Sequence, residues 1–174
     1  MAATKTLFFI AMTSSLVFPD LIHFEEYNGD FSKYLQAVYS IFHKDFIHSY
    51  PSYENVRVSV RKYPEVEGMH RTFYHMTHEG EDEENRQPDI RRMERIRFPR
   101  FVVDNHVHDT ILVWKNRRGK DTRTLLYSET ENYLVVLTER KEYYLFITAY
   151  LVERKHRQDK LLKEYEEYIK TKTA

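Results

Sequence analysis

The stretch that decides the fold covers residues 132–150 and reads Asn-Tyr-Leu-Val-Val-Leu-Thr-Glu-Arg-Lys-Glu-Tyr-Tyr-Leu-Phe-Ile-Thr-Ala-Tyr. Two apolar runs rich in β-branched and aromatic residues, 133–137 and 143–147, flank a polar link at 138–142. This pattern predicts a β-hairpin with a loop longer than two residues. Because both runs are almost continuously apolar, we expect the two strands to be covered on both faces and to lie centrally in a sheet.

The second strand of this hairpin ends in Thr148-Ala149-Tyr150. Residues two apart in a strand share a face, so a hydroxyl and a phenol should emerge side by side there. A charged helix is expected to follow at residues 154–170, with its apolar side chains on one side.

The composition bounds the class of protein. A chain of 174 residues with 41% apolar residues fits one domain with its own core. The 27 basic and 27 acidic residues cancel, so no global field draws the protein to nucleic acid or membrane. The absence of cysteine excludes disulfides and thiolate metal sites, and is in keeping with a reducing compartment such as the cytoplasm.

We expect residues 1–17 to form a leader or disordered arm, or else a first strand. The apolar run at 7–12 is too short for a membrane span, and no clean cleavage site of a signal peptide follows it. Met12 offers a second translation start. Residues 18–174 should form a single domain, in which 18–68 are an N-terminal helix and strand and 69–174 hold a helix, an antiparallel meander and the C-terminal helix.

Periodicity predicts the remaining elements. Asp30 is a good N-cap for an amphipathic helix over 30–47, and Pro88-Asp89 starts a second helix over 90–96. Strands are predicted at 56–63, 70–78, 110–115 and 123–127. The expected fold class is therefore α+β, a curved antiparallel sheet of four or more strands with N-terminal and C-terminal helices packed on it.

Two histidine pairs raise the question of a metal. His75 and His78 are three apart, and His106 and His108 would face one side of an extended segment. Neither pair is accompanied by a carboxylate at a spacing typical of metal sites. We therefore expect no metal or other cofactor.

The residue types also suit metal-independent phosphodiester cleavage, which needs a base, an acid and cations for the charge that develops on phosphorus. His70 or His75 can titrate near neutral pH, and arginines hold phosphate bidentately. Thr148 and Tyr150 can hydrogen-bond phosphate oxygens or orient a base. The candidate phosphate-holding cations are Arg92, Arg95, Lys115 and Arg123. A chain so rich in these residue types equally suits a surface-charged binding domain.

Four segments, taken in order, resemble phage-associated nuclease domains of the superfamily that joins barnase, EndoU, the colicin tRNases and RelE. They are Arg92-Met-Glu-Arg95-Ile-Arg-Phe-Pro, Ile-Leu-Val-Trp114-Lys115, Tyr-Leu-Val-Val-Leu-Thr-Glu-Arg140 and Tyr-Leu-Phe-Ile-Thr148-Ala-Tyr150. The resemblance covers residues 73–165, and the closing Thr-Ala-Tyr is its most telling part. Where relatives tend to carry Trp, this chain has Phe98, which we expect to pack or stack.

The resemblance implies an endoribonuclease that cleaves RNA by attack of the 2′-hydroxyl, acting as a toxin or phage-defence effector of a mobile element. The alternative is a catalytically inactive RNA- or protein-binding domain of the same fold. His75 would be the general base or acid, Arg92 and Arg95 would hold the scissile phosphate, and Thr148 and Tyr150 would position it. The substrate would also be bound by Lys115, Arg123 and His70. The implied partners are a tRNA or messenger RNA and an antitoxin or immunity protein, with no membrane.

Overall fold

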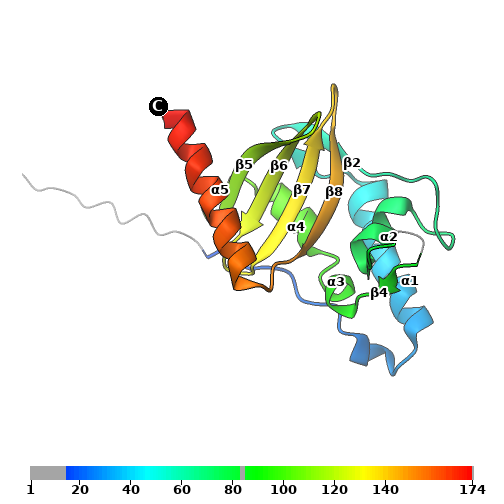
Figure 1. Ribbon diagram of the computed structural model, residues 1–174. Coiled ribbons are helices and arrows are strands. Elements are labelled where there is room, and N and C mark those ends of the chain that lie inside the picture. The colour runs from blue at the N-terminus through cyan, green and yellow to red at the C-terminus, as the bar shows by residue number, and fades with distance from the viewer. Residues whose placement is uncertain (1–14, 83–84, 174) are drawn as a thin grey trace, which may run out of the picture.

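In a computed structural model, which describes residues 15–82 and 85–173, a six-stranded curved sheet has the strand order β1-β2-β8-β7-β6-β5 (Figure 1). Its strands are β1 (Ser52–Tyr53), β2 (Val56–Ser59), β5 (Ile111–Arg118), β6 (Asp121–Ser128), β7 (Tyr133–Glu139) and β8 (Tyr144–Leu151). The last four form the predicted antiparallel meander, and the predicted hairpin of β7 and β8 is central in the sheet. Strand β2 extends the sheet by pairing with β8 in parallel.

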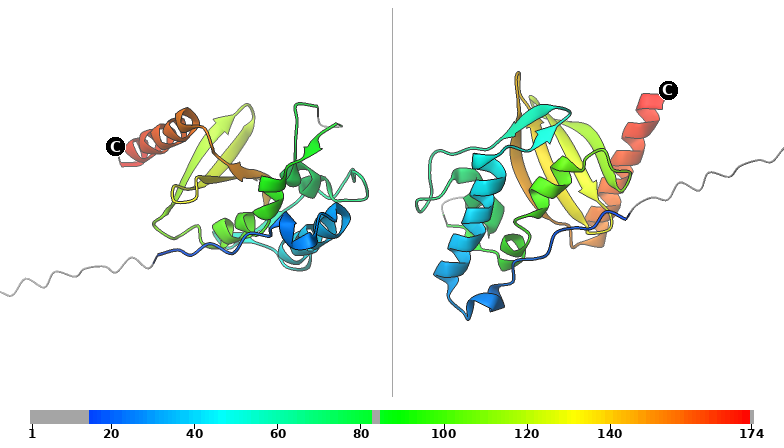
Figure 2. Two further views of the ribbon diagram at one scale, coloured as in Figure 1. Left: turned by 90° about the horizontal axis from the view of Figure 1, so that it is seen from below. Right: turned by 180° about the vertical axis from the view of Figure 1, so that it is seen from behind.

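Helices cover both faces of the sheet. The longer ones are α1 (Phe31–Phe42), which continues as a π-helical turn η2 (His43–His48), and α5 (Lys155–Thr173). The shorter ones are η1 (Phe24–Tyr27), α2 (Arg71–Thr77), α3 (Ile90–Glu94) and α4 (Phe98–Asp104), and a small ribbon pairs β3 (His78–Glu79) with β4 (Gln87–Pro88). Seen from below, α5 lies on one side of the sheet while α4 and α1 lie on the other (Figure 2). The expected α+β fold class is confirmed.

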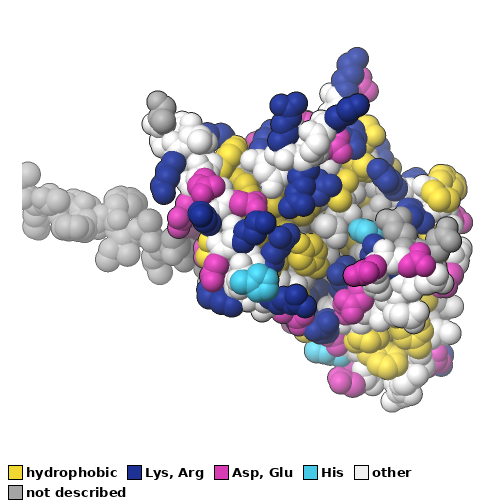
Figure 3. Space-filling view, in the orientation of Figure 1, with side chains coloured by type: hydrophobic (Ala, Val, Ile, Leu, Met, Phe, Trp, Pro, Cys, Tyr) yellow, Lys and Arg dark blue, Asp and Glu magenta, His cyan; other side chains and the backbone are white. Residues whose placement is uncertain are grey.

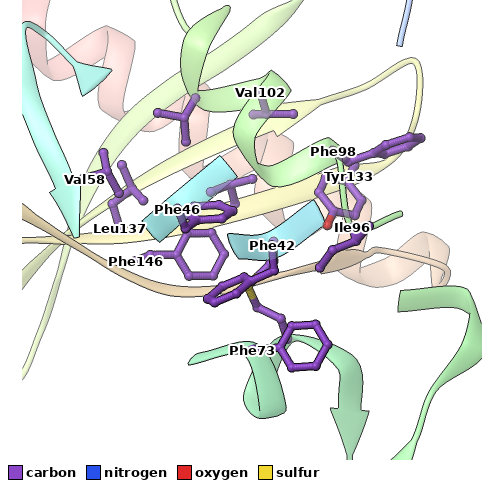
Figure 4. Packing of buried hydrophobic residues seen from close by; sticks show 14 of the residues in the cluster. Phe42, Phe46, Val58, Phe73, Ile96, Phe98, Val102, Tyr133, Leu137 and Phe146 are labelled. Carbon is purple, nitrogen blue, oxygen red and sulfur yellow. The ribbon is translucent and has the colours of Figure 1, made fainter. Parts of the chain in front are cut away.

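Two apolar clusters hold these layers together. The larger one joins α1, η2, α2 and α4 to one face of the sheet, and Phe42, Phe46 and Phe146 meet within it (Figure 4). The smaller one joins α5 to the opposite face around Trp114, whose indole packs against Tyr165 with ring centroids 5.9 Å apart. Because β7 is buried from both sides, its run of apolar residues is continuous.

The helix starts follow from their caps. The side chain of Asp30 accepts a hydrogen bond from the backbone N–H of Lys33 at 3.0 Å, and Asp89 accepts one from Arg92 at 3.3 Å. Both predicted helices are therefore confirmed in position. The second one is interrupted after Glu94, and a new helix begins at Phe98 with Pro99 in its first turn.

The predicted strand at 70–78 is wrong, because this segment forms helix α2. The buried residues of this segment do not alternate, as those of a half-buried strand would; they are Thr72, Phe73, Tyr74, Met76 and Thr77. The β propensity of Phe, Tyr and Thr is overridden by packing against α1 and the sheet.

The predicted strand at 56–63 is shortened for a related reason. Only Val56–Ser59 pairs in the sheet. Farther along, the carbonyls of Arg61 and Lys62 accept hydrogen bonds from the backbone N–H groups of Thr72 and Arg71, at 3.0 and 3.2 Å. These carbonyls thus accept hydrogen bonds from N–H groups at the start of α2. Such N–H groups have no hydrogen-bond partner within their own helix.

Strand β8 carries a β-bulge that the alternation did not predict. Val136 pairs with Thr148 and Leu137 with Phe146, so Ile147 is the extra residue. Beyond the bulge Ala149 points into the larger cluster and Tyr150 into the smaller one. Thr148 and Tyr150 therefore share the face that α5 partly covers, as expected.

The expectations for residues 1–14, including the choice between Met1 and Met12 as the start, lie outside the described residues. Leu16 and Phe18 pack against the larger cluster, so the described chain contacts the core from there on. Among the helices of residues 15–82 and 85–173, none is both long and apolar enough to cross a membrane.

Candidate functional site

A hollow of about 260 Å³ opens where α2 lies beside β8 on the face that also carries α5. Strand β2 pairs only with Tyr144 and Leu145 of β8. On that edge, helix α2 rather than a strand contacts β8 beyond these residues. We call this the arginine hollow, and its lining residues are Arg61, Arg71, Thr72, His75, Asp121, Arg123, Arg140, Phe146 and Ile147. In the space-filling view, Lys and Arg side chains gather over this side of the sheet (Figure 3).

The arginine hollow is strongly electropositive. Among the described lining residues, four arginines face one carboxylate, that of Asp121, which is already paired with the Arg140 guanidinium at 2.9 Å. Within the described residues, neither Arg61 nor Arg123 forms an ion pair, and the buried Nε of Arg123 lacks a hydrogen-bond partner. A chain of zero net charge thus concentrates unneutralised positive charge at one concave place, which attracts anions.

Local structure fixes the geometry of this hollow. Arg71 and His75 are four residues apart on α2, so they lie on the same helical face. The Thr72 hydroxyl accepts a hydrogen bond from the backbone N–H of Arg61 at 2.8 Å, while the Thr72 N–H donates to the Arg61 carbonyl. This pair of bonds ties the segment that carries Arg61 to the first turn of α2.

A second hollow, much smaller at about 50 Å³, lies farther along β8. We call it the Tyr150 hollow, and it is lined by Glu79, Asp89, Arg91, Arg92, Tyr150, Leu151 and Glu153. The guanidinium carbon of Arg92 lies 5.8 Å from the centre of the Tyr150 ring. Here the arginines are neutralised, because Arg92 pairs with Asp89 at 3.2 Å and Arg91 pairs with Glu153.

Of the eight residues selected from the sequence, His75 and Arg123 line the arginine hollow, and Arg92 and Tyr150 line the Tyr150 hollow. Thr148 lies between the two, because Ile147 belongs to the first hollow and Tyr150 to the second. Three residues of strand span about 10 Å, so the hollows are neighbours along one track.

Three selected residues lie elsewhere. Arg95 donates a hydrogen bond to the Arg91 carbonyl at 3.0 Å and lies 6.0 Å from the Phe98 ring, outside both hollows. Lys115 alternates with Trp114, so it lies on the opposite face of the sheet, where its ammonium pairs with Glu139 at 3.4 Å. The His70 ring is hydrogen-bonded to the Tyr39 hydroxyl, away from either hollow.

Two aromatic residues of the segments that carry the resemblance have structural roles, and for Phe98 this is the expected one. Trp114 is 1% exposed and belongs to the core. Phe98 is buried, and its ring packs against those of Phe18 and Tyr133 at centroid distances of 4.9 and 5.3 Å.

The histidine pairs considered for metal binding are engaged in other ways. The Nδ1 atom of His78 is hydrogen-bonded to the Thr77 hydroxyl at 3.0 Å, and that of His108 to the Thr110 hydroxyl at 2.8 Å. Across residues 15–82 and 85–173, no group of three or more His, Asp and Glu side chains is arranged to hold a metal ion. In the arginine hollow the donor set is one histidine and one carboxylate beside four guanidinium groups, which disfavours a divalent cation.

Three of the histidines make stability depend on pH. Burial is the main cause that lowers the pKa values of His78, His43 and His70. The positive charge of His48 also lowers the pKa of His43, and that of His43, whose ring lies 4.9 Å away, also lowers the pKa of His70. An unfolded histidine has a pKa of about 6.5, so acid protonates the unfolded chain first. We expect stability to be greatest above pH 6.5 and to fall as the pH drops toward the lower folded pKa values.

Thermal unfolding followed from pH 7.5 to 5.5 measures this effect. Replacing His43, His70 and His78 by asparagine should flatten the dependence, whereas His156→Gln, at an exposed position, should leave it unchanged. A melting temperature that is constant over this range in the unmodified chain would contradict the assignment.

The sequence did not single out Arg61, Arg71, Thr72 and Arg140 as members of the site. Arg71 and His75 have the four-residue spacing of one helical face, but that signal carries meaning only once the segment is identified as a helix. Arg140 and Arg61 come from a loop and an extended segment, and only the packing of α2 beside β8 brings them together.

Neither family models, nor curated proteins, nor solved structures yield a match to this chain. A concave, cationic hollow with one imidazole can bind a phosphodiester and move a proton beside it.

Proposed function

We propose that this protein is a metal-independent endoribonuclease whose active site is the arginine hollow. The observation that supports it best is the placement of His75 among Arg61, Arg71, Arg123 and Arg140 on one concave surface. Phosphodiester cleavage of RNA needs a titratable group beside cations that stabilise a developing negative charge. The hollow offers both, and the one carboxylate among its described lining residues, that of Asp121, is paired with Arg140.

In the proposed reaction, His75 removes the proton of the 2′-hydroxyl, and that oxygen forms a bond to the adjacent phosphorus. The bond from phosphorus to the 5′-oxygen breaks, and the departing oxygen takes up a proton from solvent. Arg123, which has no ion pair among the described residues, would hold the non-bridging oxygens. The products would be a 2′,3′-cyclic phosphate and a 5′-hydroxyl end.

The charge distribution favours a selective enzyme over a general RNA binder. Non-specific binding to a long nucleic acid depends on many phosphate contacts spread over a surface, but this chain has no net charge, and four arginines of its described residues gather in the arginine hollow. A toxin or phage-defence effector acting on a tRNA or messenger RNA in the cytoplasm fits this pattern. Such an effector would need an antitoxin or immunity protein as a partner.

The experiment is to incubate the purified protein in excess chelator with one RNA pool and with DNA of the same sequences. We expect RNA fragments only, because DNA lacks the attacking 2′-hydroxyl. Loss of cleavage on chelation, with recovery on adding zinc or magnesium, would contradict the mechanism. Binding of RNA without cleavage would instead favour the catalytically inactive binding domain.

Expression in bacteria should arrest growth, and His75→Ala should relieve that arrest.

A further inference from the structure

The Tyr150 hollow lies on the track of the proposed substrate but has a different chemistry from the arginine hollow. Its arginines are neutralised by Asp89 and Glu153, so it has no surplus cation to offer a phosphate. What it does offer is an aromatic ring, a nearby guanidinium and carboxylates. An uncharged nucleobase can stack on an aromatic ring or on the plane of an arginine guanidinium.

The size and position of this hollow agree with that chemistry. At about 50 Å³ it is too small to enclose a nucleotide, so a base would lie on it by one face. The spacing of about 10 Å between Ile147 and Tyr150 along β8 matches the axial rise of about three nucleotides in one strand. A phosphate in the arginine hollow would therefore place a base one to three nucleotides away over Tyr150.

We infer that the Tyr150 hollow is a base-stacking subsite for single-stranded RNA, in which Tyr150 and Arg92 bind a nucleobase within about three nucleotides of the scissile phosphate. The inference rests on the proposed function of the arginine hollow. It gives Tyr150 a substrate-binding role through its ring, in place of a chemical role through its hydroxyl.

The carboxylates would add a preference among bases. Glu79 is exposed and has no ion pair among the described residues, so its oxygens are available to accept hydrogen bonds. Cytosine, adenine and guanine present an exocyclic amino group to such an acceptor, whereas uracil does not. Glu79→Gln should reduce the preference for a base with an amino group over uracil.

The experiment measures binding of an oligonucleotide that carries a 2′-deoxy sugar at the scissile position, so that cleavage is not required for the readout. In matched oligonucleotides each of the three nucleotides on either side is made abasic in turn. We expect one abasic position to weaken binding about 5- to 100-fold. Tyr150→Ala should cause a similar loss with the intact oligonucleotide and no further loss with the abasic one.

Two variants separate the ring from the hydroxyl. Tyr150→Phe keeps the aromatic face and should bind the oligonucleotide more tightly than Tyr150→Leu, which fills the space without an aromatic face and should bind like Tyr150→Ala. If Tyr150→Phe cleaves as poorly as Tyr150→Ala, the hydroxyl acts in the chemistry and the inference is wrong. Equal binding by all variants at every abasic position would also contradict the inference. Failure to cleave any RNA would contradict the proposed function, but the binding measurements would still test the stacking subsite.

Discussion

Replacing His75 by alanine should lower the rate of RNA cleavage by about 10²- to 10⁴-fold, the range for loss of a general acid or base. Affinity for an uncleavable RNA should change little, because the arginines of the hollow remain. Stability should also be kept, since the side chain of His75 is partly exposed in the hollow rather than in either apolar cluster. Single-turnover cleavage, RNA binding and thermal unfolding on the same two proteins measure all three.

Two controls make this prediction specific. His156→Ala removes an exposed histidine on α5 and should cleave at the unmodified rate. His70→Ala removes the other histidine that the sequence suggested, and it should cost stability through its bond to Tyr39 rather than through the chemistry. A His75→Ala protein that cleaves as fast as the unmodified one would rule out His75 as the general base.

Arg123 gives the second large effect. Arg123→Met keeps the apolar stem and removes the guanidinium, so a charged hydrogen bond to phosphate worth ~1.5–3 kcal/mol is lost. We expect kcat/KM to fall about 10- to 100-fold. The salt dependence of binding should also weaken by about 0.7 in the logarithmic slope, as expected for one phosphate contact to a single strand.

Lys115→Met is the matched control, because it removes one positive charge from the neighbouring strand but on the opposite face of the sheet. It should leave cleavage and its salt dependence unchanged. Equal losses in the two variants would mean that RNA does not use the face that holds the arginine hollow. Arg123→Lys should recover only part of the activity, since an ammonium cannot bind phosphate bidentately.

The strongest parts of the fold could be predicted because local signals agree with the tertiary structure there. In β7, residues 133–137 are apolar and buried on both faces, and in β8 the same holds for residues 144–146. Asp30 and Asp89 are good caps and do cap helices. At α2 the local propensity of the sequence and the tertiary structure disagree. Phe73 and Tyr74 favour a strand locally, but packing under α1 makes the segment helical.

In the candidate site, too, local patterns predict some features, while others depend on tertiary contacts. Strand alternation predicts that Thr148 and Tyr150 share one face, and this prediction is correct because the alternation continues beyond the bulge at Ile147. The sequence could not show that Arg123 and Lys115 point to opposite faces, since that depends on the register of two strands with each other. Arg61 and Arg140 join His75 only through contacts distant in sequence, so no local pattern could have selected them.

The central claim is that RNA is cleaved at the arginine hollow by attack of its own 2′-hydroxyl. Mass spectrometry of the ends of a single-cut oligonucleotide, treated in excess chelator, tests it most directly. We predict a 2′,3′-cyclic phosphate on one fragment and a 5′-hydroxyl on the other, with both absent when the His75→Ala protein is used. A 5′-phosphate end, or the same products at the same rate from His75→Ala, would contradict it.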